Sequence, residues 1–421
     1  MLQKISSKLI LLVIVTVSVC FHACKDDRIE PKIIKAKKRT ALVYIVAQNT
    51  LNNFVSLDLD EMEEGFADVT TPEDYNFLIY VDDYNTPRLL KFEKGDDNQV
   101  VIDTVKTYPS QNSLDISVMS SVMNEIFSAY EAESYGLVLW SHANGWLPGS
   151  VQPNTGVSLR SFGDDSGFYM DLLDLKTALL SCPKFEFILF DACNMQSIEM
   201  AYELRDATNY FIGSPGEIPG YGAPYERVVP AMLSQSDPAS EIAQQYFDYY
   251  NALYDYPSRT TVYPYGVAIS VVDTRNLNEL ATATKSIIQQ YVQDKILTSD
   301  FVSYDDYYRN YYYDLGELVK SITGGNNSYA AWKTVYDRVV IKFLTTSHIL
   351  TTYKSSYGIM VPMQNATGLA TFIPISKNEN FLDGSYWKNQ SQAYLETETA
   401  RLDSYYQKFE WYAAGGWSSV N

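Results

Sequence analysis

Histidine and cysteine are scarce in this sequence, and acidic residues outnumber basic ones. The 421 residues include three histidines, four cysteines, 32 lysines and arginines, and 51 aspartates and glutamates, which gives a formal charge of −19. A chain this acidic should avoid nucleic acid and anionic lipid. The sequence also lacks an internal repeat, a P-loop and a dinucleotide-binding fingerprint, so no nucleotide site is indicated.

The first 24 residues have the pattern of an export signal. Two lysines flank the start of an apolar run over residues 9–19, and a small residue stands directly before Cys24. This pattern resembles a bacterial lipoprotein signal, so we predict removal of residues 1–23 and attachment of lipid to Cys24. The alternatives are an ordinary cleaved secretory signal and a retained membrane anchor, for which the run is short.

The segment after Cys24 indicates where the mature protein resides. A lysine and two aspartates at 25–27 resemble the surface-export signal of lipoproteins from the Bacteroides group. We therefore expect an outer-membrane lipoprotein that is surface-exposed or otherwise periplasmic, attached to the membrane through lipid at Cys24. Residues 24–38 are polar and lack periodicity, which predicts a tether. In that oxidising compartment Cys182 and Cys193 remain, which is no disulfide framework.

Apolar runs rich in β-branched and aromatic residues predict buried strands at residues 41–49, 76–83, 135–145 and 185–193. Segments with helical spacing lie between them, at 114–133 and 171–182. Strands that alternate with helices indicate an α/β fold with a mostly parallel sheet sandwiched by helices. We assign residues 39–262 to a first domain. Strand and helix patterns restart after it, so residues 263–421 form a predicted α/β accessory region.

Two of the predicted strands end in reactive residues, one at His142 and the other at Cys193. Ligands of open α/β sheets bind outside the carboxyl ends of strands, so these residues mark the candidate site. If Cys193 is a nucleophile, its base must be His142 or His348, because His22 belongs to the signal. His348 lies in a mixed apolar and hydroxyl segment, which suits a structural histidine.

The pair of Cys193 and His142 suits thiol chemistry. A nearby imidazole lowers the pKa of a thiol and later protonates the leaving amine. Backbone N–H groups in the turn after His142 and at Cys193 can form an oxyanion hole, and Gly145 would help the turn open. A free cysteine taken alone is more often a buried core residue. The place of Cys193 at a strand end, just after an acid, favours the catalytic interpretation.

These residues also carry a family resemblance. LVLWSHANGW, followed 51 residues after its histidine by the cysteine of FDAC, resembles the clostripain-related cysteine peptidases, whose fold is that of caspases and gingipains. The likeness extends over most of residues 39–421 through ALVYIVAQNTLNN, MAYELRDATNYFIGSPGEIPGYG and ATGLATFIP. It implies a caspase-like catalytic domain with Cys193 as nucleophile and His142 as general base and acid. It also implies an oxyanion hole from the N–H groups of Ala143 and Cys193, peptide or protein substrates, and no required cofactor.

The same resemblance implies cleavage after arginine or lysine, because Asp191 stands where the family places the acid of that substrate pocket. Two residues depart from the family pattern. Ala143 replaces the usual glycine after the histidine, and Tyr221 stands where relatives often carry a second acid, with Glu217 as a substitute for it. An alternative role for Asp191 is to cap the helix that follows.

A polar loop rich in glycine and serine separates the two predicted catalytic residues, and Arg160 is its one basic residue. Because relatives mature by cutting themselves in this region, we predict self-cleavage after Arg160; the alternative is a plain surface loop. A group of acids nearby raises the question of calcium, but their spacing matches no EF-hand loop, so no metal site is assigned. These acids are Asp164, Asp165, Asp171 and Asp174.

Two other functions are compatible with the sequence. A caspase-like scaffold that has lost catalysis would serve as a surface binding protein, an alternative encouraged by Ala143, Tyr221 and the 35 tyrosines. We interpret the densest tyrosine stretch, at residues 304–318, as half-exposed packing. A hydrolase acting on other amide bonds would share every catalytic residue and differ in its substrate pocket.

Overall fold

The computed structural model describes residues 36–148, 161–256, 258, 265–354 and 358–420. Residues Lys37–Asn421 form one compact unit. Its first strand starts at Arg39, where the sequence predicts the folded part to begin. The predicted signal peptide and the predicted lipidation site, Cys24, lie outside the described residues. Across the part of the chain that is described, no helix has the length and apolar character needed to span a bilayer.

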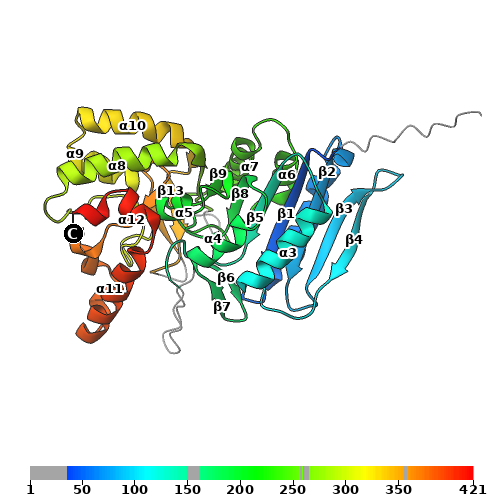
Figure 1. Cartoon of the computed structure of the whole chain (residues 1–421), viewed down its shortest axis with the longest axis horizontal. Helices are drawn as coiled ribbons and strands as arrows, with labels where there is room; N and C mark the ends of the chain where they lie inside the picture. Colours follow the sequence, from blue (N-terminus) through cyan, green and yellow to red (C-terminus); the bar gives the residue numbers. More distant parts are fainter. Residues whose placement is uncertain (1–35, 149–160, 257, 259–264, 355–357, 421) are drawn as a thin grey trace, which may run out of the picture. The chain divides into compact units, whose positions relative to one another are not determined.

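A large sheet forms the centre of this unit (Figure 1). Its strands are β1 Arg39–Val46, β2 Tyr75–Asp82, β3 Arg88–Lys94, β4 Val100–Thr107, β5 Tyr135–Trp140, β8 Phe185–Asp191, β9 Thr208–Gly213, β10 Ala268–Asp273 and β12 Val340–Thr345. They lie in the order β12-β10-β9-β8-β5-β1-β2-β3-β4. The inner strands from β9 to β2 pair in parallel, and two antiparallel strands extend the sheet at each edge.

Three short antiparallel pairs lie outside the large sheet among the described residues. They are β6 Phe162–Asp165 with β7 Phe168–Met170, β11 Tyr313–Asp314 with β15 Ala370–Thr371, and β13 His348–Thr351 with β14 Ile359–Pro362. The site described below uses residues from the carboxyl end of β13.

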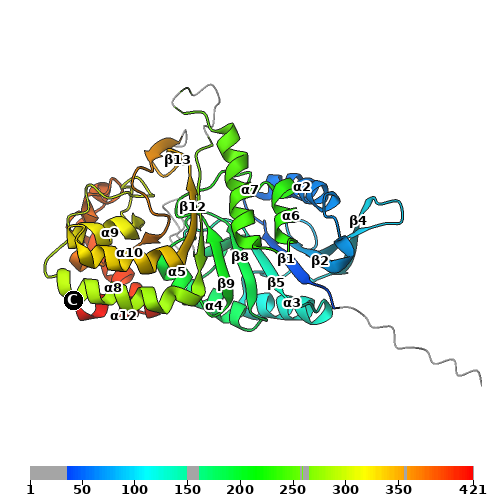
Figure 2. The same cartoon turned by 90° about the horizontal axis from the view of Figure 1, so that it is seen from above.

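Helices cover both faces of the sheet. They are α2 Val55–Ala67, α3 Ile116–Ala129, α4 Leu172–Leu180, α5 Ile198–Glu203, α6 Tyr225–Met232, α7 Pro238–Leu253, α8 Leu277–Tyr291, α9 Leu315–Thr323, α10 Asn327–Val339, α11 Gln392–Tyr406 and α12 Glu410–Ala414. Figure 2 shows α2, α6 and α7 on one side of the sheet and α3 and α4 on the other. The predicted α/β fold, a mostly parallel sheet between helices, is confirmed.

Strand β1 explains why the inner strands read as continuous apolar runs. Alternate side chains of the strand enter two different cores: Leu42, Tyr44 and Val46 face one, and Ala41, Val43 and Ile45 face the other. All of these residues are fully buried. Each large apolar side chain so buried contributes about 1.5–3 kcal/mol, so neither face tolerates polar residues.

The boundary predicted at residue 262 does not separate two compact units. Strands β10 and β12 come from the predicted accessory region, yet they continue the sheet beyond β9. Strand β15 also contacts the segment that follows β8, because the N–H of Ala370 donates to the carbonyl of Gln196 at 3.0 Å. Residues 263–420 therefore complete the same fold that residues 39–262 begin.

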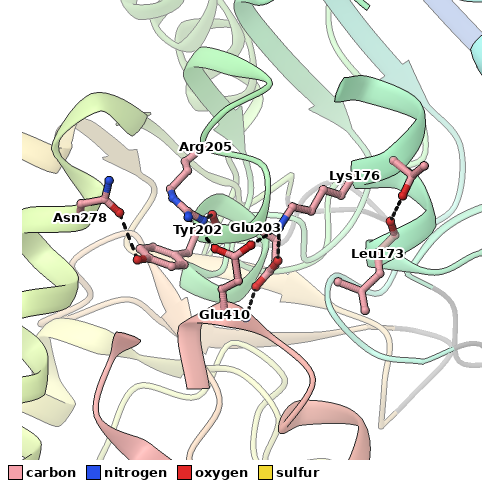
Figure 3. A network of polar contacts seen from close by, with 8 residues as sticks. Leu173, Lys176, Tyr202, Glu203, Arg205, Asn278 and Glu410 are labelled. Atoms are coloured by element: carbon pink, nitrogen blue, oxygen red, sulfur yellow. Dashed lines mark hydrogen bonds and ion pairs between the residues drawn. The ribbon is translucent and has the colours of Figure 1, made fainter. Parts of the chain in front are cut away.

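A network of charged residues ties the C-terminal helix α12 to α4 and α5 (Figure 3). Nζ of Lys176 lies 2.8 Å from a carboxylate oxygen of Glu203, whose side chain is almost fully buried, and it also contacts Glu410. Arg205 pairs with the second oxygen of Glu410. Removing Lys176 would leave the buried Glu203 carboxylate without its ion-pair partner, and Glu410 links α12 to both cations, so the network specifies where α12 docks.

The tyrosine-rich stretch 304–318 is more deeply buried than predicted. The exposure of Tyr304, Tyr311, Tyr312 and Tyr313 is 1% or less, so the prediction of half-exposed packing is wrong for them. Their rings fill the core between the sheet and the C-terminal helices. Two of the four hydroxyl groups donate to buried acceptors: Tyr304 donates to Asp314, and Tyr312 donates to the carbonyl of Asn144.

Candidate active site

The parallel pairing of β5 with β8 brings the two predicted catalytic residues to one place. Trp140 lies opposite Asp191 in the register of the two strands. His142 and Cys193 each stand two residues beyond this pair, where the adjacent strands leave the sheet. Both line one pocket at the carboxyl ends of the strands. The register of the two parallel strands therefore brings His142 and Cys193 to a shared pocket, as the sequence predicts for neighbouring parallel strands.

The segment that carries His142 is anchored to the end of β1. The Ser141 hydroxyl donates to the carbonyl of Val46 at 2.8 Å and accepts the N–H of Asp164 at 3.2 Å. The hydroxyl of Thr50, in the turn after β1, lies 2.8 Å from Nε2 of His142. These contacts fix the half-buried imidazole at the rim of the pocket.

The Cys193 thiol is half-buried against the loop that follows β9. The N–H of Ile218 donates to its Sγ at 3.4 Å. Burial raises the pKa of the thiol to about 12, with further increases from the charges of Glu217 and Asp191, while the Ile218 hydrogen bond lowers it. In this conformation the sulfur is therefore protonated at neutral pH, and an attack on substrate requires a base to remove the proton.

The turn after His142 accommodates Ala143 without strain. In the bridge between Ala143 and Phe162, the hydrogen bonds come from the residues on either side: Gly163 donates to the carbonyl of His142, and Asn144 donates to that of Ser161. The N–H of Ala143 therefore points away from Phe162. Ala143 is not among the described residues with positive φ, whereas Gly145 has a φ of +59°. The left-handed position of this turn is thus residue 145, and alanine suffices at 143.

Gly145 also allows the histidine and cysteine turns to pack closely. A Cβ built on Gly145 would lie 2.4 Å from the carbonyl oxygen of Asn194, which follows Cys193. No side chain fits at that separation. The predicted role of Gly145 in the turn therefore has two physical reasons, its backbone conformation and this contact.

Asp191 lies at the base of the pocket with one carboxylate oxygen held by the protein. Its Oδ2 accepts hydrogen bonds from the N–H of Ala223 at 3.0 Å and the hydroxyl of Tyr225 at 2.8 Å. Its Oδ1 is buried and has no hydrogen-bond partner among the described residues. Burial raises the pKa of Asp191 to about 6, and the two hydrogen bonds lower it. The next helix, α5, is capped by Ser197 rather than by Asp191.

The pocket has a volume of about 440 Å³ and combines apolar walls with the acid at its base. Its lining includes Leu51, Phe54, Trp140, Ser141, His142, Asp191, Ala192, Cys193, Glu217, Ile218, Pro219, Gly220, Tyr221, Gly222, Tyr265, Leu350 and Thr352. The glycine at 222 is required, because a Cβ there would lie 2.7 Å from Asp191 Oδ2. Such a cavity suits a long side chain that carries one polar group at its end.

Glu217 and Tyr221 both line this pocket, but neither replaces a second acid at its base. The Glu217 carboxylate accepts hydrogen bonds from the hydroxyl groups of Thr351 and Thr352 and from the N–H of Thr352. Tyr221 packs edge-on against Phe54 with ring centroids 5.3 Å apart, and its side chain remains about half exposed. Tyr221 therefore forms part of an aromatic wall near the opening.

Other residues singled out in the sequence lie apart from the pocket lining. His348 begins β13, where its ring packs against Tyr256 at 4.3 Å between centroids. Asp164 and Asp165 belong to β6, and Asp171 and Asp174 lie at the start of α4. Within the described ranges, no three His, Cys, Asp or Glu side chains gather in a way that would hold a metal ion. Arg160 lies outside the described residues.

The structure adds site residues that the sequence did not single out. Thr50 follows the carboxyl end of a predicted strand, so the rule that sites form at strand ends would have found it. Tyr225 follows the loop dense in glycine and proline, and nothing in its spacing marks it as a partner of Asp191. Thr351, Thr352 and Tyr353 come from a segment more than 150 residues beyond Cys193, and no local pattern predicts their contacts with the site.

A sheet that presents a histidine and a cysteine at the ends of adjacent parallel strands defines a cysteine peptidase of the caspase-like type. The model of the clostripain family matches residues 43–420. Clostripain from Hathewaya histolytica is 25% identical over 226 residues, a match that covers 46% of this chain and 42% of the length of clostripain. The chain therefore belongs to the clostripain family of cysteine-type endopeptidases.

Two solved structures are similar over nearly the whole fold. A secreted C11 cysteine protease from Bacteroides thetaiotaomicron, in complex with an irreversible peptide inhibitor, is 39% identical with a TM-score of 0.77; the match covers 91% of this chain and 100% of that one. An inactive zymogen C11 protease from Parabacteroides distasonis is 27% identical with a TM-score of 0.72, covering 91% and 99%. The likeness thus includes the residues beyond 262.

Substitution of Glu217 tests the electrostatics of the thiol. Glu217→Gln removes a negative charge that raises the pKa of Cys193, so we expect a lower thiol pKa and alkylation that is several-fold faster at pH 8. The measurement is the rate of iodoacetamide labelling against pH in residues 25–421 with Cys182→Ala, where Cys193 is the remaining cysteine. An unchanged or higher midpoint would contradict the assignment of the charge effect.

Proposed function

We propose that this chain hydrolyses peptide bonds after arginine or lysine through a dyad of Cys193 and His142. The observation that supports the proposal is the register of Trp140 with Asp191, together with the pocket that His142, Cys193 and the buried Asp191 all line. The irreversible peptide inhibitor bound to the Bacteroides thetaiotaomicron relative supports a peptide as the occupant of the pocket.

The proposed reaction has two stages. His142 takes the proton of the Cys193 thiol, and the thiolate attacks the carbonyl carbon of the substrate. The tetrahedral intermediate collapses when the imidazolium returns that proton to the leaving amine, which leaves a thioester on Cys193. Water, deprotonated by His142, then attacks the thioester, and the thiol regains its proton as the acid product departs.

The oxyanion of each intermediate would be held by the N–H groups of Ala143 and Cys193. The turn geometry supports this role, because the N–H of Ala143 points away from its bridge partner Phe162. Preorganised donors of this kind contribute roughly 10²–10³ in rate. No cofactor or metal takes part in the proposed steps.

The proposed preference for a basic side chain rests on Asp191. Its buried Oδ1 faces no protein donor among the described residues, which suits an ammonium or guanidinium group at the base of the pocket. The stem of such a side chain would pack along the apolar wall that includes Phe54 and Tyr221. Glu217 would act on the thiol electrostatically rather than bind the substrate charge, since its oxygens accept hydrogen bonds from Thr351 and Thr352.

Substitutions of Cys193 and His142 test the dyad. Residues 25–421 should turn over fluorogenic peptides ending in arginine or lysine, but not those ending in aspartate, and EDTA should leave the rate unchanged. Cys193→Ala and His142→Ala should each lose about 10³-fold or more in kcat. Cys182→Ala is the matched control and should keep wild-type activity, because that half-buried thiol packs beside Met123, outside the pocket lining.

Peptide turnover that survives Cys193→Ala would remove the dyad from consideration. Neither turnover nor thiol labelling, even after the chain is nicked in the loop around Arg160, would favour the alternative of an inactive scaffold that binds partners. Labelling of Cys193 without turnover of any peptide would point to a different amide substrate.

Asp191 predicts a pH dependence for basic substrates. Its pKa of about 6 means that the carboxylate is charged above this pH and neutral below it, so KM for arginine peptides should rise as pH falls through about 6. Asp191→Asn should lower kcat/KM for arginine peptides about 100-fold or more and abolish this change in KM. Asp206→Asn, an exposed site with the same charge change, is the control. An Asp191→Asn enzyme with wild-type selectivity would contradict the role.

We also propose that the chain matures by cutting itself after Arg160. The inactive zymogen form of the Parabacteroides distasonis relative supports a processing step in this family. The intact mass of purified residues 25–421 should resolve into two fragments that end and begin at 160 and 161. Arg160→Ala and Cys193→Ala should each stay intact, and Arg160→Lys should still be cut. A wild-type chain that is fully active while uncut would contradict this proposal.

The proposed location is the outer-membrane surface, through lipid on Cys24 after loss of residues 1–23. The sequence pattern before Cys24 supports it, and the relative from Bacteroides thetaiotaomicron is a secreted protease. Substitution of Cys24 by alanine should release the protein from membranes, as followed by fractionation.

A further inference from the structure

One short segment, Thr351–Tyr353, contacts all three loops that build the candidate site. It begins at the last residue of β13 and comes from the region predicted to be accessory. We propose that Tyr353 is a positioning residue of the catalytic dyad, because its hydroxyl joins the turn after His142 to the turn after Cys193. This inference rests on the proposed dyad.

The hydroxyl of Tyr353 joins two hydrogen bonds that connect Asn194, Tyr353 and Asn144. The side-chain amide of Asn194 donates to the Tyr353 oxygen at 2.6 Å. The Tyr353 hydroxyl in turn lies 3.2 Å from Oδ1 of Asn144 and donates to it. Asn194 directly follows Cys193, and Asn144 stands two residues after His142, so each turn is held within two residues of its catalytic side chain.

Neighbouring contacts hold Tyr353 and the histidine turn in place. The ring of Tyr353 stacks on Tyr308 with centroids 5.7 Å apart, and the next residue, Lys354, pairs with Asp306. Tyr312, from the same part of the chain, donates to the backbone carbonyl of Asn144 at 2.6 Å. The Asn144 turn is therefore bound through both its side chain and its backbone.

The same segment also holds the third loop of the site. Thr352 donates its hydroxyl to Glu217 at 2.8 Å, and the N–H of the next residue, Ile218, donates to the Cys193 sulfur. A displacement of Thr351–Tyr353 would thus shift the turn of the proposed general base His142, the turn of the nucleophile Cys193 and the loop beside the nucleophile. The strained backbone of Asn194, with a φ of +59°, places this amide where the Tyr353 oxygen accepts it.

The physical consequence concerns the thiol. An imidazolium stabilises a thiolate more strongly when the two groups are closer. A wider separation of the two turns would therefore raise the pKa of the Cys193 thiol. Asp191 belongs to β8 and is held by Ala223 and Tyr225, so the hydrogen bonds that position its carboxylate do not involve Tyr353.

The test compares two tyrosine-to-phenylalanine variants in residues 25–421. Tyr353→Phe keeps the stacked ring and removes the hydroxyl. Tyr336→Phe is the matched control, since that buried tyrosine also loses a hydroxyl with two partners, both on Thr367, away from the pocket lining. Thermal unfolding of each variant checks that the fold is retained. The readouts are kcat and KM for an arginine peptide and, with Cys182→Ala also present, the rate of iodoacetamide labelling of Cys193 against pH.

We expect Tyr353→Phe to lower kcat about tenfold with KM within about twofold, and to slow the labelling of Cys193 several-fold at pH 8. Tyr336→Phe should leave the labelling rate unchanged. A labelling rate equal to that of the wild type in Tyr353→Phe would overturn the inference, whatever the change in kcat. Cys193→Ala is measured in parallel: if it retains turnover, the dyad itself fails, which is a separate result from an unchanged labelling rate in a Cys193-dependent enzyme.

Discussion

The in-register pairing of β5 with β8 is the constraint on which the candidate site depends. The pairing of Trp140 with Asp191 sets where each strand leaves the sheet, and the second residue beyond this pair is His142 on one strand and Cys193 on the other. A shift of the pairing by one residue would turn every side chain of a strand to the opposite face. The burial of both faces of these strands makes such a shift costly, so core packing and site geometry are specified together.

The inner part of the fold could be predicted because its strands are buried on both faces. Runs such as the one ending in Val46 are apolar at every position, which few other structures require. The edge strands gave no such signal. Strand β4, Val100–Thr107, is exposed along most of its length, and β3 mixes lysine and glutamate with its leucines, so neither stands out from a polar loop. Nothing in the sequence indicated that β10 and β12, which lie beyond residue 262, continue the same sheet, because the order of strands in a sheet cannot be inferred from their order in the chain.

The candidate catalytic residues could be predicted from the sequence more easily than the residues that hold them in place. His142 and Cys193 stand out because few residues of either kind exist and both follow predicted strands, and Asp191 lies on the same strand end. The residues that hold them are tyrosines, threonines and asparagines, which are common throughout the chain. Their roles depend on contacts between positions as distant as Asn144 and Tyr353, and only the folded arrangement brings these together.

Several parts that complete the fold and the site are synthesised after His142 and Cys193. They are β10, β12, β15 and Tyr353. Protein chains emerge and cross membranes from the amino terminus, and domains fold as units once their residues are available. Cys193 and His142 would be in place well before the strand that extends the sheet and the tyrosine that joins their turns. A partly synthesised chain would thus carry both reactive residues without the completed arrangement around them, which ties competence for proteolysis to the arrival of the last third of the polypeptide.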